Sequence, residues 1–143
     1  MTAASRSEQP IAAFMTPSPP TIDCSCSIAE ARELIAAEGA RHLPVLDRGA
    51  LVGVASACDL DRLQLGKPNV EPEVLAVAEA MKPQPFIVDP AMPVSRVIAR
   101  MVEEGLNVAV VVDQAHVVGI FNSRDALKLL SELFADEPSR RLN

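Results

Sequence analysis

The chain repeats itself once, and this internal repeat constrains the fold more than any other feature of the sequence. A shift of 66 positions superimposes the two halves without a gap. Apolar residues then fall on apolar residues, and identical residues coincide at widely separated positions. The identical pairs include Met15 with Met81, Pro17 with Pro83, Asp23 with Asp89, Gly39 with Gly105, Gly53 with Gly119 and Asp59 with Asp125. We therefore expect two copies of one structural unit.

The same order of elements is predicted for each copy: a short extended segment, a helix, a β-hairpin and a second helix. Apolar residues recur at helical spacing from Ile28 and from Val94, and Gly39 and Gly105 follow as helix C-caps. β-branched runs separated by four residues predict the hairpins. The predicted strands are 43–46 and 51–55 in copy one and 108–112 and 117–121 in copy two, and the closing helices run from 57 to about 65 and from 123 to about 134.

These elements predict an α/β (α+β) fold of tandem β-α-β-β-α repeats. One copy has roughly 50 residues, too few to bury both faces of its sheet and its helices alone. The two copies are therefore expected to pack together with pseudo-twofold symmetry. The predicted boundaries are 11–65 for repeat 1, 66–73 for a linker that contains Pro and Gly, 74–134 for repeat 2, and 1–10 and 135–143 for flexible tails.

Composition excludes several classes of protein. The chain is 49% apolar but has no Trp or Tyr and only four Phe, so the core must be aliphatic. A net charge of −6 argues against general binding of nucleic acid, which needs a basic face. No apolar run approaches the roughly 20 residues that span a bilayer. The polar N-terminus lacks the apolar segment of a secretory signal, so a cytoplasmic protein is expected.

Neither a metal site nor an enzyme is predicted. The three cysteines, Cys24, Cys26 and Cys58, have no second cysteine pair or clustered histidine to complete a zinc site, and their odd number suits a reducing compartment. The chain contains no Walker loop and no Gly-x-Gly-x-x-Gly motif. Cys58 adjoins Asp59, but neighbouring residues on a helix do not face each other. We expect no bound cofactor apart from a regulatory ligand.

The segment from Gly53 to Asp59 has the pattern Gly-x-x-Ser-x-x-Asp, at the point where a strand is predicted to end and a helix to begin. Exposed N–H groups and the helix dipole favour an anion such as a phosphate there. The Ser56 hydroxyl can donate to phosphate or ribose, and the Asp59 carboxylate can accept from ribose hydroxyls. This pattern therefore indicates a site for a nucleotide.

The same residues also have a purely structural interpretation. Ser56 with Asp59, and Asn122 with Asp125, have the spacing of an N-cap residue and an acid in the first helical turn. Any sequence that needs a stable helix start uses this pattern. The spacing alone favours capping, whereas the preceding Gly53 and the repeat favour binding. The two roles can coexist.

Taken together, the motifs resemble those of the CBS domain family over residues 11 to about 133. The resemblance rests on Met15-Thr16-Pro17, on Gly39 followed by His42-Leu43-Pro44-Val45, on Gly53-Val54-Ala55-Ser56-Ala57-Cys58-Asp59, and on their counterparts in copy two. It implies a module that binds adenosyl compounds, such as AMP, ADP, ATP, S-adenosylmethionine or NADH, in clefts between the copies. It also implies a homodimer of two such modules.

The resemblance assigns residues to one favoured pocket. There, Phe86, Leu106 and Asn107 of copy two are expected to face Ser56 and Asp59 of copy one. Phe86 has a backbone N–H to offer an adenine base, and Ser56 supplies the hydroxyl. We predict nucleoside recognition at this pocket.

A second pocket departs from the family pattern. It pairs Pro20, Ala40 and Arg41 with Asn122 and Asp125, but Pro20 has no N–H and Asn122 replaces a hydroxyl residue. This pocket is expected to be weak or empty.

Histidine 42 is a separate candidate. By the resemblance, His42 precedes Leu-Pro-Val at a position that faces phosphate. The alternative is a hydrogen-bonded histidine at the start of a strand.

The sequence thus predicts a regulatory module that senses an adenine nucleotide. No effector domain is recognised, so the module is expected to stand alone and to act on a separate, unidentified protein, without nucleic acid or membrane partners. The alternative is a ligand-free dimeric interaction scaffold whose working surface is built from helices such as Ile28–Ala37 and Val94–Val102. Nucleotide-dependent thermal stability distinguishes the two.

Overall fold

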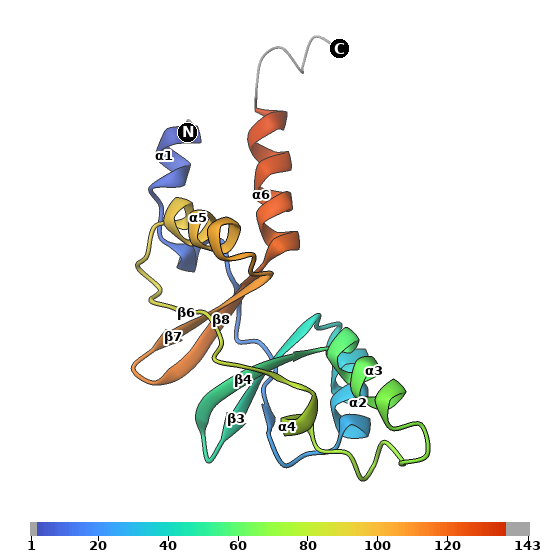
Figure 1. Cartoon of the computed structure of the whole chain (residues 1–143). Helices are drawn as coiled ribbons and strands as arrows, with labels where there is room; N and C mark the ends of the chain where they lie inside the picture. Colours follow the sequence, from blue (N-terminus) through green and yellow to red (C-terminus); the bar gives the residue numbers. More distant parts are fainter. Residues whose placement is uncertain (1–2, 137–143) are drawn as a thin grey trace. The chain divides into compact units, whose positions relative to one another are not determined.

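The structure is a computed structural model that describes residues 3–136 of the chain. These residues form two compact units (Figure 1). Unit 1 contains residues 3–17, 86–114 and 118–136, and unit 2 contains residues 18–85 and 115–117. Each unit has its own four-stranded sheet and its own hydrophobic core, which is aliphatic in unit 2 but in unit 1 also contains the fully buried Phe121.

The leading segment of each repeat joins the sheet of the other repeat. Strand β1 (Thr16–Pro17) pairs antiparallel with β8 (His116–Asn122), and β5 (Lys82–Pro83) pairs antiparallel with β4 (Ala50–Ser56). Neither short strand was predicted, because a Pro-rich segment gives no strand pattern. Each compact unit therefore combines most of one repeat with the segment that precedes the other.

Unit 2 has the strand order β2-β3-β4-β5. β2 (Ile22–Asp23) pairs parallel with β3 (His42–Asp47), and α2 (Ile28–Glu38) forms the crossover between them. β3 and β4 form an antiparallel hairpin, which is followed by α3 (Ala57–Gly66). The short helix α4 (Val77–Ala80) leads into β5.

Unit 1 repeats this plan with the order β1-β8-β7-β6. β6 (Ile87–Val88) pairs parallel with β7 (Val108–Asp113), with α5 (Val94–Glu104) between them in the chain. β8 follows β7, and α6 (Ser123–Ala135) follows β8. A single turn of 3₁₀ helix, η1 (Ile11–Ala13), occupies the place that α4 has in unit 2. The predicted α/β fold of two repeats is confirmed.

Local sequence explains where helices α2 and α5 end. Gly39 and Gly105 have φ angles of 63° and 65°, the left-handed conformation that a C-cap glycine adopts without strain. At the start of α2, Ser27 and Glu30 form a reciprocal capping box.

The hairpin turns are shorter than predicted. Each turn has two central residues rather than four, Arg48-Gly49 and Gln114-Ala115, and all of them have positive φ. Such primed turns match the twist of the flanking strands, which therefore extend by one residue on each side. His116, one of the four residues between the predicted strands 108–112 and 117–121, is therefore the exposed first residue of β8 rather than part of a turn.

Both cores are completed by the exchanged segments. Val77 is fully buried with Ile28 and Leu43 in the unit 2 core. Its repeat counterpart Ile11 is fully buried with Phe121 in the unit 1 core. Burying a side chain of this size contributes about 1.5–3 kcal/mol, so each exchanged segment is part of the unit it joins.

The N-terminal residues predicted as a tail form a helix, α1 (Ala3–Ser7), which lies beside α6 in Figure 1. Arg6 lies 3.6 Å from Glu132 and 3.6 Å from Asp136, two acids of the α6 end. These ion pairs could not be predicted from local sequence, because their partners are distant in the chain. In the predicted C-terminal tail, residues 137–143 lie outside the described part of the structure.

The predicted linker at 66–73 begins at the last residue of α3 and continues as turns. The Gln64 side chain holds it by donating to the Val70 carbonyl at 2.9 Å. Among residues 3–136, no helix is both long enough and apolar enough to cross a membrane.

Candidate functional site

The start of α3 is a complete capping box. The backbone N–H of Ser56 donates to Asp59 Oδ2 at 2.9 Å, and the backbone N–H of Asp59 donates to Ser56 Oγ at 3.3 Å. The Ser56 hydroxyl also donates to Asp59 Oδ2, at 2.9 Å. The structural interpretation of the Ser-x-x-Asp pattern is therefore confirmed for this helix.

Asp59 nevertheless differs from an ordinary capping acid, because it is buried. It is 4% exposed and is the one buried polar or charged residue in the described part of the chain. Its second oxygen, Oδ1, accepts from Arg62 Nη1 at 3.3 Å, while the Arg62 side chain remains 71% exposed. A buried carboxylate is costly unless it is paired and hydrogen-bonded, and Arg62 supplies one of these partners from the solvent side.

The β3–β4 register places a histidine beside this box. His42 lies directly opposite Ser56 in the antiparallel pair, so the start of β3 and the end of β4 meet at the start of α3. His42 is half-buried, and Arg41 before it is exposed. The structure thus brings together His42, Ser56 and Asp59 within unit 2. This grouping offers backbone N–H groups, a hydroxyl, a carboxylate and an imidazole.

The corresponding position in unit 1 is built from different side chains. Asn122 N–H donates to Asp125 Oδ2 at 2.9 Å, and Asp125 N–H donates to Asn122 Oδ1 at 3.0 Å. Asp125 is only half-buried, and Lys128 stands where unit 2 has Arg62. Within residues 3–136, no ion pair joins Lys128 to Asp125. The two repeats therefore have helix starts built from different side chains, Ser56 in unit 2 and Asn122 in unit 1.

Two candidate residues of copy two, Phe86 and Asn107, are fixed in place by contacts within unit 1. The Asn107 carbonyl accepts from the Ser123 backbone N–H at 2.9 Å and from its hydroxyl at 3.2 Å, which ties the start of β7 to the start of α6. The Phe86 carbonyl accepts from Val110 N–H at 2.8 Å. The Arg100 guanidinium lies 5.1 Å from the centre of the Phe86 ring, within cation–π range.

The predicted residues fall into two groups by unit. Unit 2 holds Pro20, Arg41, His42, Ser56 and Asp59, and unit 1 holds Phe86, Leu106, Asn107, Asn122 and Asp125. Each predicted pocket combines residues of both units, so each pocket stays a prediction.

Packing explains the glycines that precede the two capping boxes, Gly53 and Gly119. A Cβ at Gly53 would lie 2.6 Å from Met81 Sδ and 2.8 Å from the Lys82 carbonyl oxygen, and a Cβ at Gly119 would overlap the Met15 side chain. The exchanged segment thus leaves no room for a Cβ at Gly53, and at Gly119 it leaves room only if the Met15 side chain moves. Gly53 therefore does not distinguish binding from capping, because its packing requires glycine in either case.

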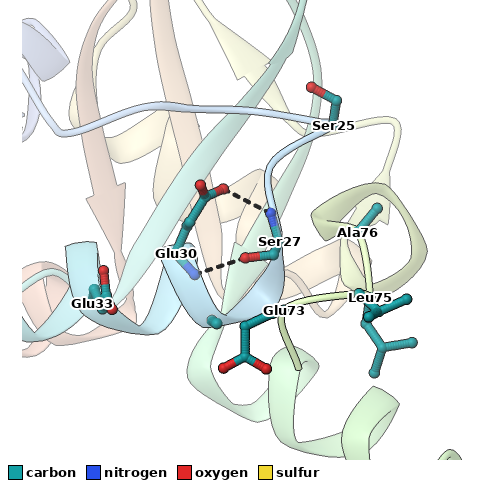
Figure 2. Close-up of a pocket in the computed structure, with 9 residues that line it drawn as sticks. Ser25, Ser27, Glu30, Glu33, Glu73, Leu75 and Ala76 are labelled. Carbon is teal, nitrogen blue, oxygen red and sulfur yellow. Dashed lines mark hydrogen bonds between the residues drawn. The ribbon is translucent and has the colours of Figure 1, made fainter. Parts of the chain in front are cut away.

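A separate hollow of about 410 Å³ lies at the start of α2 (Figure 2). It is lined by Glu30, Glu33 and Glu73 together with Ser25 and Ser27. The Ser27 N–H already donates to Glu30 Oε2 at 2.9 Å. An acidic wall and an occupied helix N-terminus do not suit an anion, so this hollow is not a second phosphate site.

The cysteines do not form a metal centre in the described residues, where no cluster of three metal-ligating side chains occurs. Burial, reinforced by nearby acids, raises the pKa of the Cys24 and Cys26 thiols. Both are therefore neutral thiols at neutral pH.

Comparison with known proteins decides the family. The CBS domain model matches residues 11–66 and 77–132, most of the chain and both repeats. The chain belongs to the CBS domain family. Among curated proteins, this CBS pair is 42% identical over 64 residues to the human H(+)/Cl(-) exchange transporter 7. The match covers 44% of this chain but only 8% of the transporter, so the relative is a far longer protein.

Solved structures share the fold. The CBS domain pair of protein MJ0100, in complex with 5-methylthioadenosine and S-adenosyl-L-methionine, is 26% identical with a TM-score of 0.73, over 86% of this chain and 96% of that one. The CBS domain of a bacterial CNNM/CorC family Mg2+ transporter in complex with ATP is 22% identical with a TM-score of 0.76, over 90% of this chain and 91% of that one. CBSX2 in complex with AMP is 23% identical with a TM-score of 0.74, over 87% of this chain and 98% of that one.

Proposed function

We propose that this CBS pair is a regulatory module that binds an adenine nucleotide or another adenosyl compound at the start of α3. AMP, ADP and ATP are the leading candidates. The observation that carries the proposal is the buried Asp59 carboxylate, placed beside Ser56 and His42 at a helix N-terminus. Solved CBS relatives hold AMP, ATP or S-adenosyl-L-methionine, which supports the class of ligand.

The hydrogen bonds of Asp59 suggest how a ribose would be recognised. Ser56 donates to Oδ2 twice, whereas among residues 3–136 Oδ1 accepts only from the exposed Arg62. The Arg62 side chain is 71% exposed, so it can leave Oδ1 for solvent without losing other packing. A ribose hydroxyl can therefore replace Arg62 on Oδ1 at little cost and leave the capping box intact. Capping and binding then use different oxygens of one carboxylate.

Other predicted residues complete the proposal. Phe86, Leu106 and Asn107 would contact the base and sugar, and His42 would face the phosphate. The pocket with Pro20, Arg41, Asn122 and Asp125 is proposed as weak or empty. Regulation follows only if the ligand prefers one arrangement of the protein over another, with a separate protein receiving the signal.

Thermal unfolding in the presence of a nucleotide panel tests the proposal. A ligand that binds only the folded state raises the melting temperature by mass action. We expect millimolar AMP, ADP, ATP or S-adenosylmethionine to raise it, and GTP at the same concentration to raise it less. If no adenosyl compound shifts the melting temperature, the proposal fails and the ligand-free scaffold is favoured.

A further inference from the structure

Three contacts restrain Phe86 within unit 1. Its half-buried ring packs against the core of this unit. Its carbonyl accepts from the Val110 N–H at 2.8 Å, which ties its backbone to β7. The Arg100 guanidinium, on α5, lies over the ring at 5.1 Å from its centre. The core, a strand and a helix thus each hold one part of this residue.

The Arg100 side chain is itself held in place. Arg100 Nε donates to Glu104 Oε2, one turn further along α5. The guanidinium is planar and has several N–H donors at its edge, so it can pair with a carboxylate while its face lies over an aromatic ring. Glu104 therefore steadies the cation above Phe86.

The Phe86 peptide keeps one polar group available. Among residues 3–136, the Phe86 backbone N–H donates to no other group, although the carbonyl of the same residue is bonded to β7. A backbone N–H without an internal acceptor needs water or a ligand as its partner. This N–H is the group that would meet the adenine base in the proposed site.

The other repeat lacks both the ring and the cation. Pro20 stands where unit 1 has Phe86, and Leu34 stands where it has Arg100. The pocket predicted to be weak or empty contains Pro20, whereas the favoured pocket contains Phe86. The contact between arginine and phenylalanine therefore belongs to the favoured pocket alone.

We propose that Arg100 is a positioning residue of the ligand site: it holds the Phe86 ring still, so that the Phe86 N–H is fixed before the base arrives. This inference rests on the proposed function. A ligand binds more tightly when the residue that it contacts is already ordered, because less conformational entropy is lost on binding. Arg100 acts through Phe86 and does not touch the ligand.

Calorimetric titration of AMP into Arg100 variants tests the proposal. Arg100→Met keeps a long side chain without its charge and should weaken AMP binding about 2- to 5-fold, the range that an exposed cation–π contact can supply. Arg100→Lys keeps a cation and should recover most of this loss. Arg96→Met is the matched control, because Arg96 is exposed one turn earlier on α5, and it should bind AMP as the wild-type protein does.

A double-mutant cycle separates positioning from direct contact. Phe86→Leu removes the ring but keeps the backbone N–H, so adding Arg100→Met to it should weaken AMP binding no further. An equal loss with and without the ring would show that Arg100 contacts the ligand itself, and would overturn the proposal. If Phe86→Leu fails to fold, adenosine makes the same distinction: positioning weakens adenosine and AMP equally, whereas a phosphate contact spares adenosine.

The two proposals fail in different ways. If the wild-type protein binds AMP and a folded Arg100→Met variant binds it equally well, the positioning role is overturned and the proposed function stands. If the wild-type protein binds no adenosyl compound, the proposed function fails and the positioning role fails with it.

Discussion

The sulfur atom of Met81 lies so close to Gly53 that a Cβ on this glycine would be 2.6 Å away. The Lys82 carbonyl oxygen would lie 2.8 Å from the same Cβ. At Gly119, by contrast, the three nearest atoms all belong to the Met15 side chain. The two glycines meet the exchanged segments in the same way, but a backbone atom is among the three nearest atoms only at Gly53.

This difference predicts unequal costs for two alanine substitutions. Gly53→Ala should lower the free energy of unfolding by about 2 kcal/mol, because β5 must move away from β4. Gly119→Ala should cost less, and Met15→Ala in the same chain should relieve part of that cost, whereas Met81→Ala should relieve little of the cost at Gly53. Urea unfolding of the single and double variants measures both couplings. Gly66→Ala, where a Cβ meets nothing within 4 Å, is the control. Equal relief in both pairs would contradict the exchange geometry.

Substitution of the fully buried Ile11 tests whether the segment that precedes repeat 1 packs in unit 1. Ile11→Ala should cost about 2–5 kcal/mol of unfolding free energy, as expected for a large-to-small change in a core. The resulting NMR chemical-shift changes should concentrate at 86–133, because Ile11 packs in unit 1. Val77→Ala should instead perturb 18–66. Changes from Ile11→Ala centred on 18–66 would show that each repeat folds with its own leading segment.

The sequence predicts the elements well but not this exchange. The spacing of apolar residues and the C-cap glycines locate α2 and α5, because these signals are local. The segments around Met15 and Met81 are too similar for local sequence to tell which sheet each one joins. Which sheet each segment joins depends on tertiary packing. The local sign of it is the glycine in each strand that receives a segment, Gly53 in β4 and Gly119 in β8.

Acid should weaken unit 2 through Asp23. Hydrogen bonds from the Ser25 hydroxyl and backbone N–H hold the pKa of Asp23 below its ordinary value of 3.8. A lowered pKa in the folded state contributes stability above that ordinary value, and the contribution is lost as the pH falls through the lower, folded-state pKa. Unfolding free energies measured from neutral pH down to strong acid should therefore fall less steeply for Asp23→Asn and for Ser25→Ala than for the wild-type protein. Identical pH profiles would exclude this contribution.

Arg62 should compete with the ligand for Asp59. Arg62→Ala frees Oδ1 and should tighten adenosine binding by a few-fold, because the ribose hydroxyl then displaces no ion pair. Arg32→Ala removes the ion pair between Arg32 and Asp61, which lies in the same unit but is exposed at both ends, and should have no effect. Calorimetry with adenosine and with ATP distinguishes competition of the Arg62 guanidinium with the ribose from contact of the guanidinium with a phosphate. Weaker binding of adenosine to Arg62→Ala would contradict competition, and weaker binding of ATP alone would show that Arg62 contacts phosphate.

The candidate site could be predicted only in part. The spacing of Ser56 and Asp59 identified the helix start, but the same spacing serves capping at Ser27 and Glu30, where the acid is exposed. Burial separates the two acids, and burial depends on packing that local spacing does not encode. The pairing of His42 with Ser56 likewise requires the register of β3 and β4.

The central claim is that Asp59 recognises an adenosyl ligand in addition to capping α3. Calorimetric titration of AMP and ATP into the wild-type protein, Asp59→Asn and Glu30→Gln tests it most directly. Asparagine retains an acceptor for the Ser56 N–H, and Glu30→Gln makes the equivalent change in the α2 capping box. We expect saturable binding to the wild-type protein and to Glu30→Gln, and affinity at least about 10-fold weaker for Asp59→Asn. Unchanged affinity in a folded Asp59→Asn variant, or no binding to the wild-type protein, would contradict the claim.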